Sequence, residues 1–495
     1  FYTFKGDVEK IFELNTKFHE TLYKATKSRY LESMLKDFQF TEAELAYAQR
    51  KQESDCATDF IVFNRLDSLA FVLIPDQTLP GNEMTEKFRM HGASINKVLV
   101  DEKFQSVALI DLIDMGSLSL ALAEGLSLSS YRFEKYKTKC SSPNTLDVLV
   151  VSPAVTGCQL ATINRLTEAV FLARDMVNEP VGYLTAERLG EIIIEQGARL
   201  GFRAEVFNKK KIESLKMGGL LAVNQGSVDP PTFSVLEWNP ENAVNSKPYV
   251  LVGKGVVFDT GGINLKTPPG SLDTMKCDMS GAASVVGAFA AIVANNLPVH
   301  VIGLVPATDN RPGGNAIVPG DILTMHNGAT VEIINTDAEG RLILADALSF
   351  AKKYEPELVI DLATLTGSAV MAIGSHGTVG MGTAEDDVKA RLWEAGERTG
   401  ERVVWFPFWS DYDDEIKSEV ADIKNLGGRE AGAITAGKFL SRFIDSPWIH
   451  LDIAGPAFLS ARTNYRGIGG TGVGVRLLYR FFESLAVSAE AEKTK

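Results

Sequence analysis

The sequence VEIINTDAEGRL, Val331–Leu342, leads from a short apolar run into Asp337, Glu339 and Arg341. If this stretch is extended, alternate side chains share a face, so all three charged groups project to one side. Two carboxylates and a guanidinium on one face could bind a metal ion or a polar substrate. For an isolated Asn-Thr-Asp sequence, the commoner arrangement is a turn in which Asp337 or Thr336 caps the helix that follows.

Three more charged side chains, Lys254, Asp259 and Lys266, follow another apolar run in YVLVGKGVVFDTGGINLK. A later segment, DTMKCDMSGAA, places Asp278 at the entry to a helix. In parallel α/β sheets, binding groups gather where strands end and loops begin. Considered singly, Asp278 is more often an N-cap and Lys254 a solvated surface charge.

Together, these segments would bring four carboxylates to one edge of a sheet. Leaving them ionised and unpaired there is very costly, so cations must compensate. Two lysines and one arginine supply three positive charges. Hard oxygen ligands in this number more naturally hold divalent metal ions, and two such ions can share a bridging water. We therefore predict a dinuclear metal site whose acids are Asp259, Asp278, Asp337 and Glu339.

Compact apolar runs and helical patterns alternate after residue 180, and these elements must position the charged side chains. This rhythm is typical of a mostly parallel sheet covered by helices on both faces. The runs expected as strands or helices are Tyr249–Val252, Ala282–Ala294, Val299–Val305, Val331–Ile334, Leu342–Lys353, Leu358–Ile360 and Trp448–Ile453.

The length of 495 residues and the changing pattern along the chain predict an α/β protein of two domains. Residues 1–160 alternate short apolar runs with charged, helix-like segments and predict a smaller N-terminal α/β domain, expected to serve assembly or regulation. Apolar residues at helical spacing predict a linker helix at 161–180. Residues 181–495 are predicted to form a larger domain with a mixed, mostly parallel sheet flanked by helices.

Composition excludes several classes of function. The formal charge of −13 would repel a phosphate backbone, so nucleic acid is not an expected partner. The longest apolar stretch, Gly281–Ala294, is too short for an uninterrupted membrane span, and no membrane association is expected. Four scattered cysteines suggest neither a zinc cluster nor a disulfide framework, which favours a cytoplasmic location.

Several segments, in this order along the chain, carry a resemblance to a known family. They are VGKGVVFDTGGINLK, MKCDMSGAA, NTDAEGRL and DLATLTG, followed by GGREAGAITAGKFL and HLDIAG. The sequence resembles the cytosolic leucyl aminopeptidase family, the two-metal M17 peptidases, over about two thirds of its length. NTDAEGRL is the signature of that family. The resemblance implies that residues 181–495 are a metallopeptidase domain.

The resemblance also implies a role for each charged residue. Lys266 and Arg341 become the catalytic pair, in which Lys266 stabilises the developing oxyanion and Arg341 holds a bicarbonate that relays a proton. A lysine ligand must lose its proton, which two nearby cations would favour. The implied ligands of two divalent ions, Zn²⁺ or Mn²⁺ with Mg²⁺ or Co²⁺ as alternatives, are Lys254, Asp259, Asp278, Asp337 and Glu339.

The same resemblance implies the substrate and the assembly. A free α-amino group at the metal ions would make the enzyme remove one N-terminal residue at a time from peptides. Family members form homohexamers, which is the expectation here. The implied side-chain pocket is small and apolar, which favours leucine and other hydrophobic residues, and its lining is Met275, Thr364, Leu365, Gly367 and Ala454.

Two other functions use parts of the same pattern. A two-metal phosphoesterase could use similar carboxylates, but it would tend to recruit histidines and needs no lysine ligand. The six histidines show no H-E-x-x-H spacing and are expected to be structural or exposed. A non-enzymatic scaffold or DNA-binding assembly is disfavoured by the acidic balance. Cys277 is interpreted as a bystander, and Asp361 as a paired structural acid or as an acid that orients a metal ligand.

Overall fold

The computed structural model describes residues 60–65, 68–76, 78–111, 113–139, 146–267 and 270–493. The chain divides into two compact units. The first comprises Phe1–Ser130 and Lys139–Leu160, and the second comprises Tyr131–Thr138 and Ala161–Lys495.

In the first unit, short apolar runs form strands and longer amphipathic segments form helices, as expected from the sequence. β1 (Ile61–Arg65) and β2 (Ser68–Val72) pair antiparallel, and β3 (Ser106–Ile110) and β4 (Asp147–Val151) pair parallel. The helices α4 (Gly81–Asp101) and α5 (Gly116–Ser129) pack on each other around a buried apolar core. The predicted α/β class is therefore confirmed here.

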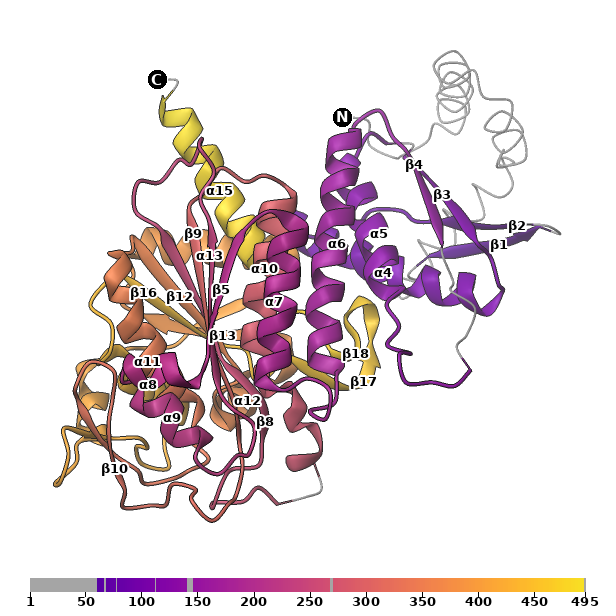
Figure 1. Ribbon diagram of the computed structural model, residues 1–495. Coiled ribbons are helices and arrows are strands. Elements are labelled where there is room, and N and C mark those ends of the chain that lie inside the picture. Colours follow the sequence, from indigo (N-terminus) through magenta and orange to yellow (C-terminus); the bar gives the residue numbers. More distant parts are fainter. Residues whose placement is uncertain are drawn as a thin grey trace. The chain divides into compact units, whose positions relative to one another are not determined.

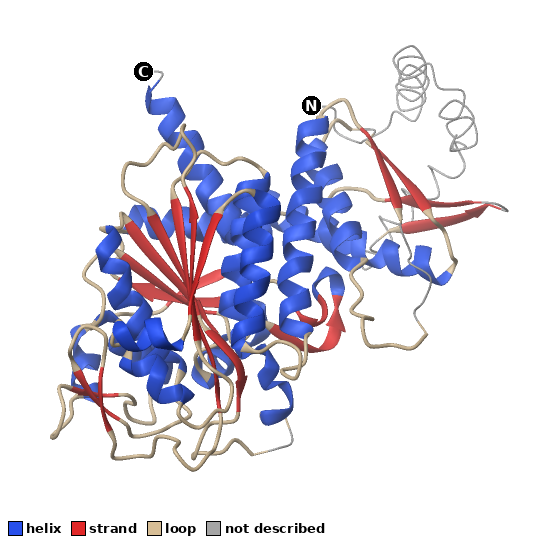
Figure 2. Ribbon diagram, in the orientation of Figure 1, coloured by secondary structure: helices blue, strands red, loops and turns tan. Residues whose placement is uncertain are grey.

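A nine-stranded mixed sheet is the centre of the second unit, and its middle strands are parallel (Figure 2). The strand order is β14-β13-β16-β12-β7-β9-β6-β5, with β8 paired to the end of β9. Strands β16, β12, β7 and β9 run parallel, whereas β6, β5 and β13 are antiparallel to their inner neighbours. The strands are β5 (Arg203–Phe207), β6 (Thr232–Trp238), β7 (Tyr249–Gly253), β8 (Gly255–Asp259), β9 (Val301–Asn310), β12 (Leu358–Ala363), β13 (Thr378–Gly382), β14 (Val403–Trp405) and β16 (Trp448–Asp452).

Helices cover both faces of this sheet, which explains why its central strands read as continuous apolar runs. Helices α7 and α10 lie on one side of the strands and α9 and α11 on the other (Figure 1). Helices α13 and α15 join the α10 side, and α14 joins the α11 side. The bounds are α6 (Gly157–Asn178), α7 (Ala186–Leu200), α8 (Lys209–Ser214), α9 (Gly218–Asn224), α10 (Ser280–Ala294), α11 (Gly340–Ala351), α12 (Gly367–Ile373), α13 (Asp386–Thr399), α14 (Gly432–Ser441) and α15 (Val475–Lys493).

One apolar run does not belong to the main sheet. The residues expected as a strand at Val331–Ile334 contribute β11 (Thr330–Glu332), which pairs with β10 (Ile322–Thr324) and β15 (Ile423–Lys424) in a separate small sheet. A further hairpin joins β17 (Phe458–Thr463) to β18 (Gly467–Gly470). Apolar runs of three or four residues do not reveal which sheet they join, because their burial pattern is the same in either.

Among the described residues, one helical stretch, Leu272–Ala294, is long and apolar enough to cross a membrane, but 94% of its apolar window is buried inside the fold. It consists of the 3₁₀ helix η1 (Leu272–Met279) followed by α10. Every residue of α10 except the last is buried. The apolar composition is thus that of a central core helix.

Candidate metal centre and active site

The site lies at the edge of the sheet where the parallel strands end. Lys254 stands directly between β7 and β8, and Asp259 is the last residue of β8. Asp278 lies on η1, just before the N-terminus of α10. Asp337 and Glu339 lie in the turn before α11. The structure therefore brings together the four acids that the sequence predicted at one edge.

The local geometry of the NTDAEGRL segment differs from both sequence predictions. The extended conformation is wrong, because Thr336 and Asp337 form a turn and α11 begins at Gly340. The capping role is also wrong, since Glu339 occupies the N-cap position and no side chain caps the helix. Asp278 likewise caps nothing, because Met279 precedes α10. A tight turn orients the side chains of Asp337 and Glu339 toward the site, and not the alternation of side chains along a strand.

Two lysines join the acids through ion pairs. Lys254 Nζ lies 2.7 Å from Asp278 Oδ1 and 2.9 Å from Glu339 Oε1. Lys266 Nζ lies 2.8 Å from Asp259 Oδ2 and 2.5 Å from Asp337 Oδ1. All but Lys266 and Asp337 are nearly inaccessible to solvent, so these pairs are held in a low-dielectric environment.

The pKa values of these groups are shifted because the carboxylates in the site outnumber the ammonium groups. Burial opposes the charge on Lys254, yet Asp278 and Glu339 outweigh it and raise the pKa of its ammonium above the ordinary value. Burial raises the pKa of Asp278 well above its usual range, although Lys254 opposes the shift. Burial and the neighbouring carboxylates raise the pKa of Asp337 to about 6. Four acids share two lysines, so further positive charge would be strongly stabilising.

Two glycines make room for this crowding. A Cβ atom at Gly340 would lie 2.3 Å from Lys254 Cε and 2.6 Å from its Nζ. Gly261 has a φ of +87°, and a Cβ there would lie 2.9 Å from Asp337 Oδ1. A side chain at either position would displace a charged group from the site, which explains why Gly340 and Gly261 are glycines.

The donor set fits divalent cations. One oxygen each of Asp259, Asp337 and Glu339 lies within 4.8 Å of the others. Asp278 Oδ2 and Glu339 Oε2 are buried and have no hydrogen-bond partner among the described residues. Such orphaned acceptors are costly unless a cation binds them. Carboxylate oxygens in this number are the ligands that Mn²⁺, Mg²⁺ and, with a nitrogen donor, Zn²⁺ accept.

Arg341 lies in the first turn of α11 and is only 4% exposed. Its Nη1 donates to the carbonyl of Asn425 at 2.8 Å. Burial lowers the pKa of this guanidinium to about 10, with Glu339 and Asp452 opposing the shift, so it remains a cation at neutral pH. Arg341 thus supplies a fixed positive charge behind the acids.

The sequence around this site is similar to that of a known protein family. The model of the cytosol aminopeptidase family, catalytic domain, matches residues 171–479 and therefore includes the acids, lysines and arginine of the site. The chain belongs to the cytosol aminopeptidase family. The predicted resemblance to the M17 peptidases is confirmed, and members of this family are metal-dependent aminopeptidases.

Relatives from the same family cover most of this chain. A probable cytosol aminopeptidase from Chlorobium limicola is 45% identical over 425 residues, which is 80% of this chain and 83% of that protein. One from Chloroherpeton thalassium is 52% identical over 67% of this chain and 65% of that protein. Among solved structures, the bottromycin maturation enzyme BotP in complex with Mn is similar, with a TM-score of 0.79 and 32% identity over 89% of this chain and 96% of that one.

One predicted pocket residue, Thr364, contacts a site acid, and two others, Leu365 and Ala454, contact Asp452. Thr364 Oγ1 donates to Asp278 Oδ1 at 2.7 Å, and its carbonyl accepts from Lys254 Nζ at 3.0 Å. The backbone N–H groups of Leu365 and Ala454 both donate to the carboxylate of Asp452. The other two, Met275 and Gly367, lie on η1 one turn before Asp278 and at the start of α12.

Sequence reasoning missed the polar side chains that orient the acids. Asn310, the last residue of β9, donates through Nδ2 to Asp259 Oδ1 at 2.8 Å and to the carbonyl of Thr336 at 3.1 Å. Asn425 donates to the carbonyl of Asn335 at 2.7 Å and fixes the same turn from the other side. Asn310 could have been found, because it ends a strand at the same edge. Asn425 is far away in sequence, and no sequence pattern connects it with the acids.

Three side chains near the site have structural roles. Asp361 is fully buried on β12, where it accepts from Trp448 Nε1 at 2.7 Å and pairs with His450 Nδ1 at 2.6 Å. Asp361 is thus a paired structural acid, as predicted, and His450 is structural. Burial raises the pKa of the Cys277 thiol to about 12, which leaves too little thiolate for a nucleophile at neutral pH.

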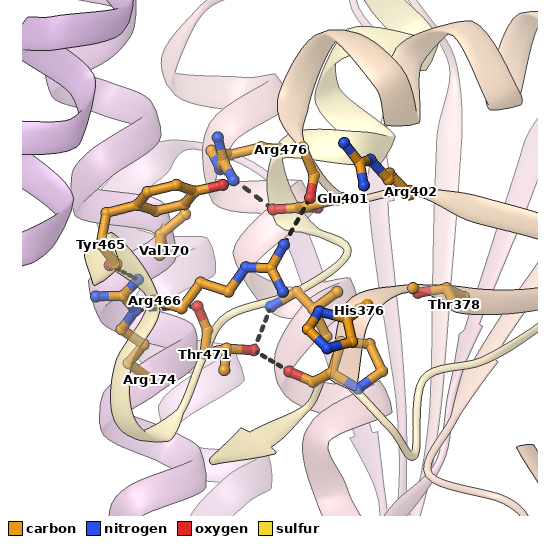
Figure 3. A pocket seen from close by; sticks show the side chains of 14 residues that line it. Val170, Arg174, His376, Thr378, Glu401, Arg402, Tyr465, Arg466, Thr471 and Arg476 are labelled. Carbon is orange, nitrogen blue, oxygen red and sulfur yellow. Dashed lines mark hydrogen bonds and ion pairs between the residues drawn. The ribbon is translucent and has the colours of Figure 1, made fainter. Parts of the chain in front are cut away.

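A separate cavity of about 20 Å³ is not lined by any of the four site acids. Several arginines are among the residues that line it (Figure 3). Arg466 donates to the carbonyls of Ser375 and Gly400, and Arg476 pairs with Glu401 at 3.2 Å. The Glu401 carboxylate also accepts backbone N–H groups at the start of α15. A space of this size holds about one water molecule, so it is no site for a peptide side chain.

Proposed function

We propose that this aminopeptidase removes single N-terminal residues from peptides, with preference for leucine and other hydrophobic residues. The observation that supports the proposal most directly is the cluster of four carboxylates and two lysines at the strand ends, with buried oxygens that a cation would satisfy. The proposed ligands of two divalent ions are Lys254, Asp259, Asp278, Asp337 and Glu339.

The chemistry divides between the ions and the side chains of the chain. When bound, a pair of divalent ions supplies an activated water, a Lewis acid for the scissile carbonyl and an anchor for the free α-amino group. Lys266 is partly exposed and held beside Asp259 and Asp337, so its ammonium can turn toward an oxyanion that develops on the substrate. Arg341 uses one N–H group of its guanidinium for the Asn425 carbonyl, and we propose that the remaining four N–H groups are available to hold a bicarbonate as proton relay.

Leucine preference follows from the proposed pocket. Met275, Leu365 and Ala454 offer apolar surface, and Thr364 and Gly367 add little bulk. All five are at least partly exposed, so they are accessible to a substrate side chain. A pocket of this kind gains affinity with each methylene that it buries.

The metal, the assembly and the location are further parts of the proposal. We propose Mn²⁺ or Zn²⁺ as the ions, supported by the oxygen-rich ligand set and by the Mn complex of the similar BotP structure. We propose a cytoplasmic location, in keeping with the name cytosol aminopeptidase of the relatives. We also propose a homohexamer that acts on peptides, as the family resemblance implies. Light scattering after gel filtration tests the assembly.

A substrate panel tests the reaction. With Mn²⁺ present, leucine p-nitroanilide should be cleaved, whereas N-acetyl-leucine p-nitroanilide should not, because it lacks the free amine. p-Nitrophenyl phosphate should also be inert, which separates the aminopeptidase from a two-metal phosphoesterase. Cleavage of the acetylated compound or of the phosphate ester would contradict the proposal.

A further inference from the structure

Asp452, the last residue of β16, joins the two loops that carry most of the proposed substrate pocket. Its Oδ1 accepts the backbone N–H of Leu365 at 3.2 Å and that of Ala454 at 3.1 Å. Its Oδ2 accepts the hydroxyl of Thr366 at 2.7 Å. Leu365 and Thr366 follow β12, Ala454 follows β16, and these strands are parallel neighbours with Ala363 opposite Asp452.

Burying a carboxylate at this position costs free energy. It is 1% exposed, and burial raises the pKa of Asp452, with His450 and the hydrogen bonds from Thr366, Ala454 and Leu365 opposing the shift. A buried acid is tolerated where several donors satisfy it, and here the donors come from both loops. One side chain therefore fixes the spacing between two otherwise independent backbone segments.

The connection extends beyond the two loops. Thr366 Oγ1 also accepts the N–H of Ala369 and so caps α12, which begins at Gly367. On the other side, Thr364 is bound to Asp278 and Lys254. The segment 364–367 is thus held at one end by the site acids and at the other end by Asp452.

We propose that Asp452 is a positioning residue that sets the width of the side-chain pocket and thereby the selectivity for leucine over smaller N-terminal residues. This inference rests on the proposed function. Among the described residues, Asp452 has no hydrogen bond or ion pair with a proposed metal ligand. Its loss should therefore change substrate selectivity without changing the amount of bound metal.

The Mn²⁺-loaded enzyme and its Asp452→Ala variant test the inference through leucine and alanine p-nitroanilides. The ratio of kcat/KM for leucine over alanine should fall about tenfold in the variant, mainly through a higher KM for leucine. The reason is that a wider pocket no longer fits the apolar side chain of leucine closely. Asp452→Asn keeps one oxygen for both backbone donors, so its ratio should stay within about threefold of the wild-type value. Bound Mn²⁺ should be the same in all three proteins.

Asp346 provides a matched control. It is fully buried on α11 and accepts the backbone N–H groups of Leu220 and His326, each at 2.9 Å, but it joins no pocket loop. Asp346→Ala should lower stability and leave the leucine-to-alanine ratio unchanged. An equal fall for both substrates in Asp452→Ala, or an equal change of ratio in Asp346→Ala, would overturn the inference.

Hydrogen exchange tests the same contact without catalysis. In Asp452→Ala, peptides that contain Leu365 and Ala454 should exchange faster, whereas in Asp346→Ala the change should appear at Leu220 and His326. If the wild-type enzyme cleaved neither substrate, the proposed function would fail. Unchanged exchange at Leu365 and Ala454 would separately overturn the role of Asp452.

Discussion

Two buried groups of charges on the same sheet have opposite character. Around Asp361, in the interior of β12, each carboxylate oxygen meets one donor, from Trp448 or from His450. At the strand ends, four acids share the ammonium groups of Lys254 and Lys266, and two buried oxygens have no partner in the described part of the chain. The carboxylate of Asp361 is complete within the protein, although Nε2 of its partner His450 has no hydrogen-bond partner among the described residues, whereas the acid cluster at the strand ends is incomplete.

The difference shows how a functional site is distinguished from a structural one. A satisfied buried acid contributes to stability and gains nothing from an added cation. An unsatisfied acid cluster costs stability until a cation binds, and the fold must be stable enough elsewhere to support it. The large buried core that surrounds β7, β9, β12 and α11 provides that support.

The largest effect should come from removing a charge at the incomplete cluster. Lys266→Ala should lower kcat/KM for leucine p-nitroanilide about 10³-fold, because the oxyanion loses its donor. Steady-state kinetics at saturating Mn²⁺ measure this effect. Lys352→Ala, which removes a surface lysine paired with Asp445, should be fully active. Retention of activity in Lys266→Ala would remove Lys266 from the mechanism.

The complete group should behave in the opposite way. Asp361→Asn should destabilise the protein by about 3 kcal/mol, because it leaves buried His450 and Trp448 imperfectly paired, while the activity of the folded fraction persists. Urea unfolding gives the free energy. The exposed Asp445→Asn should cost less than about 0.5 kcal/mol. A comparable small loss in both variants would erase the distinction between the two groups.

Metal removal should affect only the incomplete cluster. Mn²⁺ at about 100 times its Kd should stabilise the EDTA-treated protein by about 2.7 kcal/mol, because it binds the folded state alone. Thermal unfolding with and without Mn²⁺ shows the shift. Asp361→Asn should retain the whole Mn²⁺ effect, whereas Asp278→Asn should lose most of it. Full stabilisation of Asp278→Asn would show that the ion binds elsewhere.

The smallest effect should be the pH dependence of the complete group. Burial opposes the charge on His450, but Asp361 outweighs it and raises the pKa of the imidazole above its ordinary value. The native state therefore holds this proton more tightly than the unfolded chain. The resulting stabilisation is full below pH 6.5 and is lost as pH rises through the native pKa, at no more than about 1.4 kcal/mol per pH unit.

Urea unfolding of the metal-free protein at several pH values measures this dependence. The free-energy difference between wild type and His450→Gln should decrease as pH rises, since the glutamine does not titrate. A difference that stays constant with pH would mean that the imidazole of His450 has the same pKa in the folded and the unfolded chain.

The fold and the acids of the site were predictable because both leave local signals. Apolar runs marked β7, β9, β12 and β16, and charged residues directly after such runs marked the strand ends. The conformation of the NTDAEGRL turn was not predictable, because Asn310 and Asn425 hold it through hydrogen bonds from distant parts of the chain. The role of Asp452 was hidden for the same reason, since its partners leave a neighbouring strand.

All five proposed ligands lie within one continuous stretch, Lys254–Glu339, whereas most of the proposed pocket belongs to residues 364–367 and to Ala454. The parts of the chain that would make water reactive are therefore separate from those that would choose the substrate. Substitutions in the later segments could redirect the enzyme toward other N-terminal residues while the ion-binding stretch stays intact, which makes those segments the natural place to begin redesign.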